Sequence, residues 1–200
     1  MGILVNGTWQ ESDLIKNKED GKFIRPDSPF RDWITADGRP GPEGQNAYPS
    51  EKGRYHLYVS LACPWAHRVL IVRALKGLED MISVSVVHWY MGSQSWNFED
   101  GAGVIKDPIF DAKYLHEIYS HAKPDMSGKV TVPVLFDKKE KKIVNNESSE
   151  IIRIFNDAFD ELGALPGDYY PAPLRGEIDE INERIYHTLN NGVYKCGFAT

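Results

Sequence analysis

The chain has 200 residues, of which 42% are hydrophobic, 12% aromatic and 26% charged, and 23 Lys and Arg against 29 Asp and Glu give a formal net charge of −6. This composition is typical of one globular domain with an extension or part of a second domain, and it excludes a disordered or collagen-like polymer. The acidic balance disfavours nucleic-acid binding through a basic face.

The sequence predicts neither a membrane span nor a signal peptide. There is no stretch of 18 apolar residues, and the start, MGILVNGTWQESD, lacks a cationic segment followed by an apolar run. We expect a cytoplasmic protein. Its two cysteines, Cys63 and Cys196, are too few and too far apart for a disulfide framework or a structural zinc site, so we predict no bound metal.

Residues 1–53 differ in character from the rest of the chain. They are rich in Gly, Pro, Asp and Ser, with scattered aromatic residues and weak periodicity. Because a disordered tail carries fewer large apolar groups, we expect an ordered N-terminal extension that lies over a folded domain.

Residues 54–161 show the periodic patterns of alternating strands and helices. In chain order, the expected elements are a strand at 54–60, a helix at 64–77, a strand at 82–87, a short helix near 111–121, hairpin strands at 132–136 and 142–144, and a helix at 147–159. This β-α-β-α-β-β-α order, with a parallel beginning and a hairpin at the end, predicts an α/β domain of the thioredoxin-like type.

Residues 162–173 contain three prolines and two glycines, which is typical of an interdomain linker. A helical pattern resumes over 174–189, and we expect the turn Asn190-Asn191-Gly192 to follow it. Since one helix is not a domain, residues 174–200 are interpreted as the first part of a truncated helical domain.

Cys63 is the main candidate for chemistry. It lies in the run Cys-Pro-Trp-Ala at the junction of the first strand and helix, where unpaired backbone N–H groups and the positive end of the helix dipole favour thiolate over thiol. Ala66 stands where a dithiol oxidoreductase has its second cysteine, so an external thiol must resolve a mixed disulfide. The alternative is a buried structural cysteine. Cys196 is interpreted as a packing residue rather than an internal resolving thiol.

Two further motifs point to a peptide-like ligand. Pro133 begins an apolar strand, either as an edge-strand proline or with a cis bond that exposes the Val132 backbone to an extended peptide, and we favour the cis bond. Glu147 and Ser148 lead into a helix N-terminus. They can cap the helix, and Glu147 with the free N–H groups can also bind an amino acid zwitterion.

Several runs together resemble the glutathionyl-hydroquinone reductases, the xi class of glutathione transferases. They are CPWAHR, TVPVL and NNESSEI, the longer run RYHLYVSLACPWAHR, and SPFRDWIT and NNGVYKCGFAT. The resemblance covers about residues 23–200. It implies a thioredoxin-like domain that binds glutathione as co-substrate, followed by the start of an all-α glutathione transferase C-terminal domain.

The resemblance also implies roles for individual residues. Cys63 would be the catalytic cysteine, and Tyr194 would be a tyrosine that faces the aromatic substrate and supplies a proton. The residues implied in glutathione binding are Trp96, Lys129, Val132, Pro133, Glu147 and Ser148.

The implied activity is the glutathione-dependent reduction of S-glutathionyl-hydroquinones to hydroquinones. A Cys63-glutathione mixed disulfide would form and be resolved by a second glutathione. The implied partners are glutathione and glutathionyl-quinol small molecules, with a homodimer when full length. The alternatives are an omega-like thioltransferase or dehydroascorbate reductase that uses the same cysteine, and a non-catalytic assembly module of the same fold. Retention of Cys63, Pro133, Glu147 and Ser148 together favours an enzyme.

Overall fold

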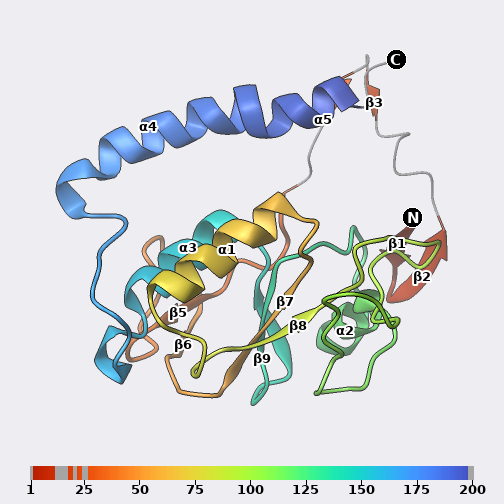
Figure 1. Ribbon diagram of the computed structural model, residues 1–200, viewed down its shortest axis with the longest axis horizontal. Coiled ribbons are helices and arrows are strands. Elements are labelled where there is room, and N and C mark those ends of the chain that lie inside the picture. The colour runs from red at the N-terminus through yellow and green to blue at the C-terminus, as the bar shows by residue number, and fades with distance from the viewer. Residues whose placement is uncertain (1, 12–17, 20–21, 24–26, 198–200) are drawn as a thin grey trace. The chain divides into compact units, whose positions relative to one another are not determined.

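The computed structural model describes residues 2–11, 18–19, 22–23 and 27–197 (Figure 1). The chain divides into two compact units, of which the first comprises Met1–Ser12 and Ser28–Gly167 and the second Asp13–Asp27 and Asp168–Thr200. The division after Gly167 falls inside the predicted linker.

A four-stranded mixed sheet forms the centre of the first unit, with the strand order β10-β9-β7-β8. Its strands are β7 (Tyr55–Val59), β8 (Ser83–Val86), β9 (Val134–Asp137) and β10 (Lys142–Asn145). β7 is parallel to β8 and antiparallel to β9, which is antiparallel to β10. Every residue of β7 and β9 is buried, as expected of central strands covered on both faces.

Three helices accompany this sheet, namely α1 (Pro64–Leu75), α2 (Leu115–Ala122) and α3 (Ser148–Asp157). α1 makes the crossover that the parallel β7–β8 pair requires. It packs against α3, and the two helices lie side by side in Figure 1. A short 3₁₀ turn, η2 (Asp160–Leu162), follows α3. The order β7-α1-β8-α2-β9-β10-α3 confirms the predicted thioredoxin-like arrangement.

The described part of the N-terminal extension contributes to the same core. Its strands in the first unit are β1 (Gly2–Val5), β2 (Thr8–Glu11), β5 (Trp33–Thr35) and β6 (Ala47–Pro49). Leu4 and Ile34 are fully buried in the core cluster. The central sheet begins at Tyr55, one residue after the predicted domain start, whereas the compact unit also includes residues 28–53.

The second unit contains a short antiparallel pair and a long helical segment. Its elements are β3 (Lys18–Glu19), β4 (Lys22–Phe23), the 3₁₀ turn η3 (Ala172–Leu174), α4 (Arg175–Ile185), the π-helical turn η4 (Tyr186–Asn190) and α5 (Asn191–Gly197). The predicted turn at 190–192 is wrong, because these residues are helical. Asn191 is buried, and one glycine in a helix costs only about 1 kcal/mol.

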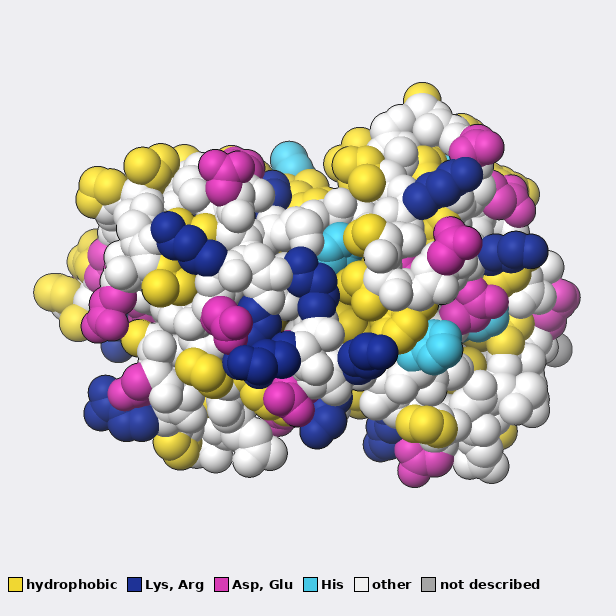
Figure 2. Space-filling view, turned by 90° about the horizontal axis from the view of Figure 1, so that it is seen from below, with side chains coloured by type: hydrophobic (Ala, Val, Ile, Leu, Met, Phe, Trp, Pro, Cys, Tyr) yellow, Lys and Arg dark blue, Asp and Glu magenta, His cyan; other side chains and the backbone are white. Residues whose placement is uncertain are grey.

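The surface of the molecule carries charges of both signs. Figure 2 shows basic, acidic and apolar side chains mixed over one face. Within the described residues, no helix combines the length and the apolar character needed to cross a membrane.

His56 is buried in the sheet between two serine hydroxyls. Its Nδ1 lies 2.7 Å from Ser83 Oγ, and its Nε2 lies 2.9 Å from Ser85 Oγ. Because Ser85 donates its proton to the Lys106 carbonyl oxygen, 2.9 Å away, the Nε2–H of His56 donates to Ser85 and Nδ1 accepts from Ser83. Burial, assisted by the nearby positive charge of Lys138, lowers the pKa of His56 to about 4.

The buried His56 is expected to make the protein less stable in weak acid. The ordinary pKa of 6.5 applies in the unfolded chain, so the folded state binds fewer protons between pH 6.5 and about 4. The free energy of unfolding should therefore fall as the pH is lowered through this window, by up to about 3 kcal/mol. Urea unfolding at about pH 7 and about pH 4.5 measures the loss. His56→Gln should lack this component, and an equal acid loss in that variant would contradict the assignment.

Candidate functional site

Cys63 lies at the N-terminus of α1. It is the N-cap residue, in an extended conformation with φ −101° and ψ 114°, and Pro64 begins the helix. Its backbone carbonyl accepts a hydrogen bond of 3.0 Å from the N–H of His67. The partly buried sulfur therefore lies at the positive end of the helix dipole, as predicted.

The segment before β9 lies against this cysteine. The Cys63 Sγ is 3.7 Å from the backbone oxygen of Val132. The bond between Val132 and Pro133 is cis, which confirms the favoured prediction. Among the described residues, no acceptor is found for the Val132 N–H. A backbone donor and a thiol thus lie together at one edge of the fold.

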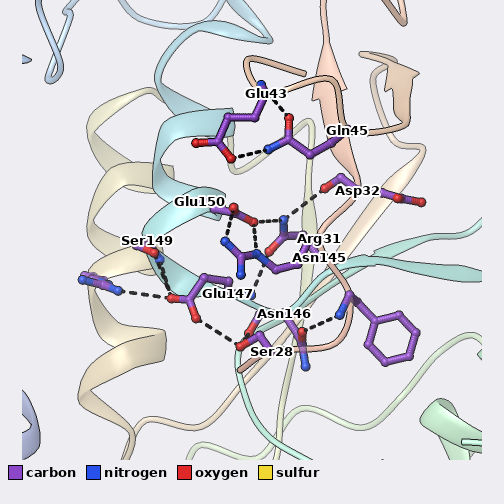
Figure 3. Close-up of polar contacts among 12 residues, drawn as sticks. Ser28, Arg31, Asp32, Glu43, Gln45, Asn145, Asn146, Glu147, Ser149 and Glu150 are labelled. Carbon is purple, nitrogen blue, oxygen red and sulfur yellow. Dashed lines mark hydrogen bonds and ion pairs between the residues drawn. The ribbon is translucent and has the colours of Figure 1, made fainter. Parts of the chain in front are cut away.

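Glu147 and Ser148 form the N-terminus of α3. Glu147 is the N-cap residue, and its Oε1 accepts hydrogen bonds from the backbone N–H and the hydroxyl of Ser149, at 3.1 and 2.9 Å. Its Oε2 accepts from Ser28 Oγ at 3.0 Å (Figure 3). Glu147 therefore caps the helix, whereas Ser148 and Ser149, the expected capping serines, are its first two residues. The role of Glu147 toward a ligand stays a prediction.

Arg68 joins α1 to the beginning of α3. Its Nε and Nη2 donate to the hydroxyl oxygen of Ser148, at 3.0 and 2.7 Å, and Nη2 lies 3.7 Å from Glu147 Oε1. Because Arg68 occupies the lone pairs of the Ser148 oxygen, the Ser148 proton is directed toward another acceptor. Arg68 was not predicted as a site residue, although it is the last residue of the CPWAHR run.

A polar network that includes Asn145 and Glu150 holds the backbone of Glu147 in place. Asn145 Oδ1 accepts from the backbone N–H of Glu147 at 2.7 Å, and Asn145 Nδ2 donates to Glu150 Oε2 at 2.7 Å. Arg31 forms a bidentate ion pair with the same Glu150 carboxylate (Figure 3). This network fixes the end of β10 and the start of α3 to the N-terminal extension.

The remaining predicted residues lie on three other segments. Trp96 is partly buried against the core in the loop before α2, where its carbonyl accepts from the Leu115 N–H at 2.9 Å. Lys129 is partly buried just before β9, and Tyr194 is partly buried in α5 of the second unit. Their roles stay predictions. Cys196 is exposed, contrary to the packing role predicted for it.

Within the described residues, no three His, Cys, Asp or Glu side chains are grouped as metal ligands. The site that the structure brings together consists of the Cys63 thiol, the Val132 backbone N–H, the Glu147 carboxylate and the N-terminus of α3. This set can hold a short peptide in extended form and present a sulfur to its middle.

The chain is similar to known proteins over its whole length. Residues 62–158 match the family described as glutathione S-transferase, N-terminal domain. The glutathionyl-hydroquinone reductase YqjG of Escherichia coli (strain K12) is 57% identical over an alignment of 201 residues, which covers 100% of this chain and 61% of the relative. The glutathione-bound structure of YqjG superimposes with a TM-score of 0.88 at 54% identity, covering 100% of this chain and 59% of that one.

Two further proteins are also similar. The structure of glutathione S-transferase Xi from Phanerochaete chrysosporium has a TM-score of 0.84 at 51% identity, covering 92% of this chain and 58% of that one. A protein of Schizosaccharomyces pombe (strain 972 / ATCC 24843) named glutathione S-transferase omega-like 2 is 52% identical over 188 residues, covering 92% of this chain and 58% of the relative. The chain thus spans less than two thirds of the length of these relatives.

Proposed function

We propose that, over the residues that it spans, the chain belongs to the xi class of glutathione transferases and reduces S-glutathionyl-hydroquinones to hydroquinones with glutathione as co-substrate. The observation that carries the proposal is the position of Cys63, at the N-terminus of α1 and 3.7 Å from the Val132 carbonyl. With Ala66 in place of a second cysteine, this arrangement suits a monothiol mechanism.

Glutathione is proposed to bind as an extended peptide along the edge that Val132 and α3 provide. The Val132 N–H pairs with the backbone of the cysteinyl residue, which brings the glutathione sulfur toward Cys63. The γ-glutamyl ammonium group binds the Glu147 carboxylate, and the γ-glutamyl carboxylate accepts from Ser148 and the helix N–H groups. Trp96 and Lys129 contact the tripeptide as well, and Pro133 shapes the segment that receives it.

The reaction proceeds in two displacement steps. The Cys63 thiolate attacks the sulfur of the glutathionyl-hydroquinone, so that a Cys63–glutathione disulfide forms and the bond between sulfur and the aromatic carbon breaks. That carbon takes the electron pair and a proton, supplied by Tyr194, to give the hydroquinone. A second glutathione thiolate then attacks the glutathione sulfur of the mixed disulfide, releasing oxidised glutathione and the Cys63 thiolate.

A second candidate is an omega-like thioltransferase activity, which the 52% identity to the protein named omega-like 2 favours. It would use the same Cys63 on disulfide substrates instead of thioethers. The proposal for the full-length protein also includes a homodimer and a cytoplasmic location.

Intact mass spectrometry tests the function directly. After incubation with a glutathionyl-hydroquinone, the wild-type protein is expected to gain the mass of one glutathione, and fresh glutathione should remove it. Hydroquinone release is followed in parallel by chromatography. Cys196→Ser, which changes the other thiol, should form the same adduct, whereas Cys63→Ser should form none.

The two candidate functions give different adduct patterns. An adduct formed from a glutathionylated disulfide but not from the glutathionyl-hydroquinone would favour the thioltransferase. A wild-type chain that binds glutathione but forms no adduct with either substrate would be a binding module, and the proposed function would be wrong.

A further inference from the structure

The hydroxyl group of Tyr119, on α2, lies at the centre of a buried hydrogen-bond network. It donates to the backbone oxygen of Thr131 at 2.9 Å and accepts from the Thr131 N–H at 3.3 Å and from Asn146 Nδ2 at 3.1 Å. A phenol has one proton and two lone pairs, so all of its hydrogen-bonding capacity is used. Burial raises the pKa of Tyr119, which keeps the hydroxyl protonated as a donor.

The two partners of this hydroxyl come directly before the two segments of the candidate glutathione site. Thr131 precedes Val132, and Asn146 precedes Glu147. The β9–β10 ladder ends at the pair Asn145 and Leu135, after a register irregularity between Ile143 and Asn145. Beyond that pair, the Tyr119 hydroxyl bridges the two segments by hydrogen bonds to Thr131 and Asn146.

Asn146 is held in one orientation by a third segment. Its Oδ1 accepts from the backbone N–H of Phe30 at 3.2 Å, and its own N–H donates to the Phe30 carbonyl at 3.1 Å. The amide nitrogen of Asn146 must therefore face Tyr119. The Phe30 and Tyr119 rings meet edge to face, with centroids 5.7 Å apart. The link is thus built into the core rather than formed by one mobile side chain.

We propose that Tyr119 is a positioning residue for glutathione, whose hydroxyl sets the spacing between the Val132 backbone and the Glu147–Ser148 helix N-terminus. This inference rests on the proposed function, because a γ-glutamyl-cysteinyl ligand must reach both segments at once. Tyr119 itself does not touch the ligand. Its effect on binding comes from the relative position of two groups that do, and small displacements of such groups weaken binding strongly.

Tyr119→Phe removes this hydroxyl and keeps the ring. Isothermal titration calorimetry of the full chain with reduced glutathione should show a dissociation constant raised by about tenfold, because Thr131 and Asn146 lose their shared partner. Tyr58→Phe is the matched control. Tyr58 is also fully buried, and its hydroxyl donates to Asp107 at 2.8 Å, away from both ligand segments. It should lose comparable thermal stability while its dissociation constant changes less than about twofold.

A double-mutant cycle separates positioning from general loosening of the core. Asn146→Ala removes the other end of the link and should weaken glutathione binding to a similar extent. The double variant Tyr119→Phe/Asn146→Ala should bind about as well as the weaker single variant, because both changes remove the hydrogen bond between Tyr119 and Asn146, while Asn146→Ala also leaves the Phe30 N–H without its side-chain acceptor. If Tyr119→Phe does not fold, Asn146→Ala against Tyr58→Phe gives the same comparison.

The outcomes distinguish this inference from the function on which it rests. Wild-type binding with equal dissociation constants for Tyr119→Phe, Asn146→Ala and Tyr58→Phe would overturn the positioning role and leave the proposed function intact. A wild-type chain that does not bind glutathione would overturn both.

Discussion

Cys63→Ser is expected to lower the rate of glutathionyl-hydroquinone reduction by at least about a thousandfold, because the hydroxyl that replaces the thiol is a poor nucleophile at neutral pH and cannot form a disulfide. The position at the α1 N-terminus favours a thiolate, and a serine there gains no comparable anion. The measurement is hydroquinone formation over time with the protein and excess glutathione.

Cys196→Ser is the control for this result. Cys196 is exposed in α5, and the proposed mechanism takes its resolving thiol from solution. Its replacement should leave the rate within about twofold of wild type. A rate that falls as far in Cys196→Ser as in Cys63→Ser would show that resolution is internal. Full activity in Cys63→Ser would place the chemistry on another residue.

The elements of the sheet domain were predictable because their side-chain periodicity is local. β7 and α1 agree with the predicted strand and helix within two residues at each end. The strands of the N-terminal extension were harder to predict, since β5 and β6 have three residues each, which are too few positions to show a period. The helix through Gly192 was missed because asparagine and glycine favour turns locally, while the buried Asn191 belongs to a continuous helical segment.

Some residues of the candidate site were likewise predictable from the nearby sequence, whereas others depend on partners that are distant along the chain. Cys63 and Glu147 were predictable because each lies at a helix N-terminus, and a strand followed by a helix signals that position. The roles of Arg68 and Ser28 were not, since their partners lie 80 and 119 residues away along the chain. No sequence pattern indicated a role for Tyr119 at the site, because a tyrosine in an amphipathic helix is normally a packing residue.

The buried ion pair between Arg54 and Asp137 is expected to contribute strongly to the free energy of unfolding. Asp137 is fully buried at the end of β9, and its Oδ2 accepts from Arg54 Nε and Nη2 at 2.9 and 2.5 Å. Its Oδ1 accepts from the backbone N–H groups of Lys139 and Glu140 at 2.8 and 3.1 Å, which closes the hairpin turn. One carboxylate therefore joins the entry of β7 to the β9–β10 hairpin.

Asp137→Ala is expected to lower the free energy of unfolding by about 3–5 kcal/mol, because it leaves a buried guanidinium without its main counter-ion and two turn N–H groups without an acceptor. Urea denaturation at neutral pH measures the change. Asp37→Ala is the matched control, since Asp37 pairs with Arg39 at 2.5 Å while their side chains are 50% and 85% exposed. Water screens that pair, so its loss should be far smaller. Equal losses in the two variants would mean that Glu51, 3.6 Å from Arg54 Nη1, takes over the charge, and that the central sheet does not depend on Asp137.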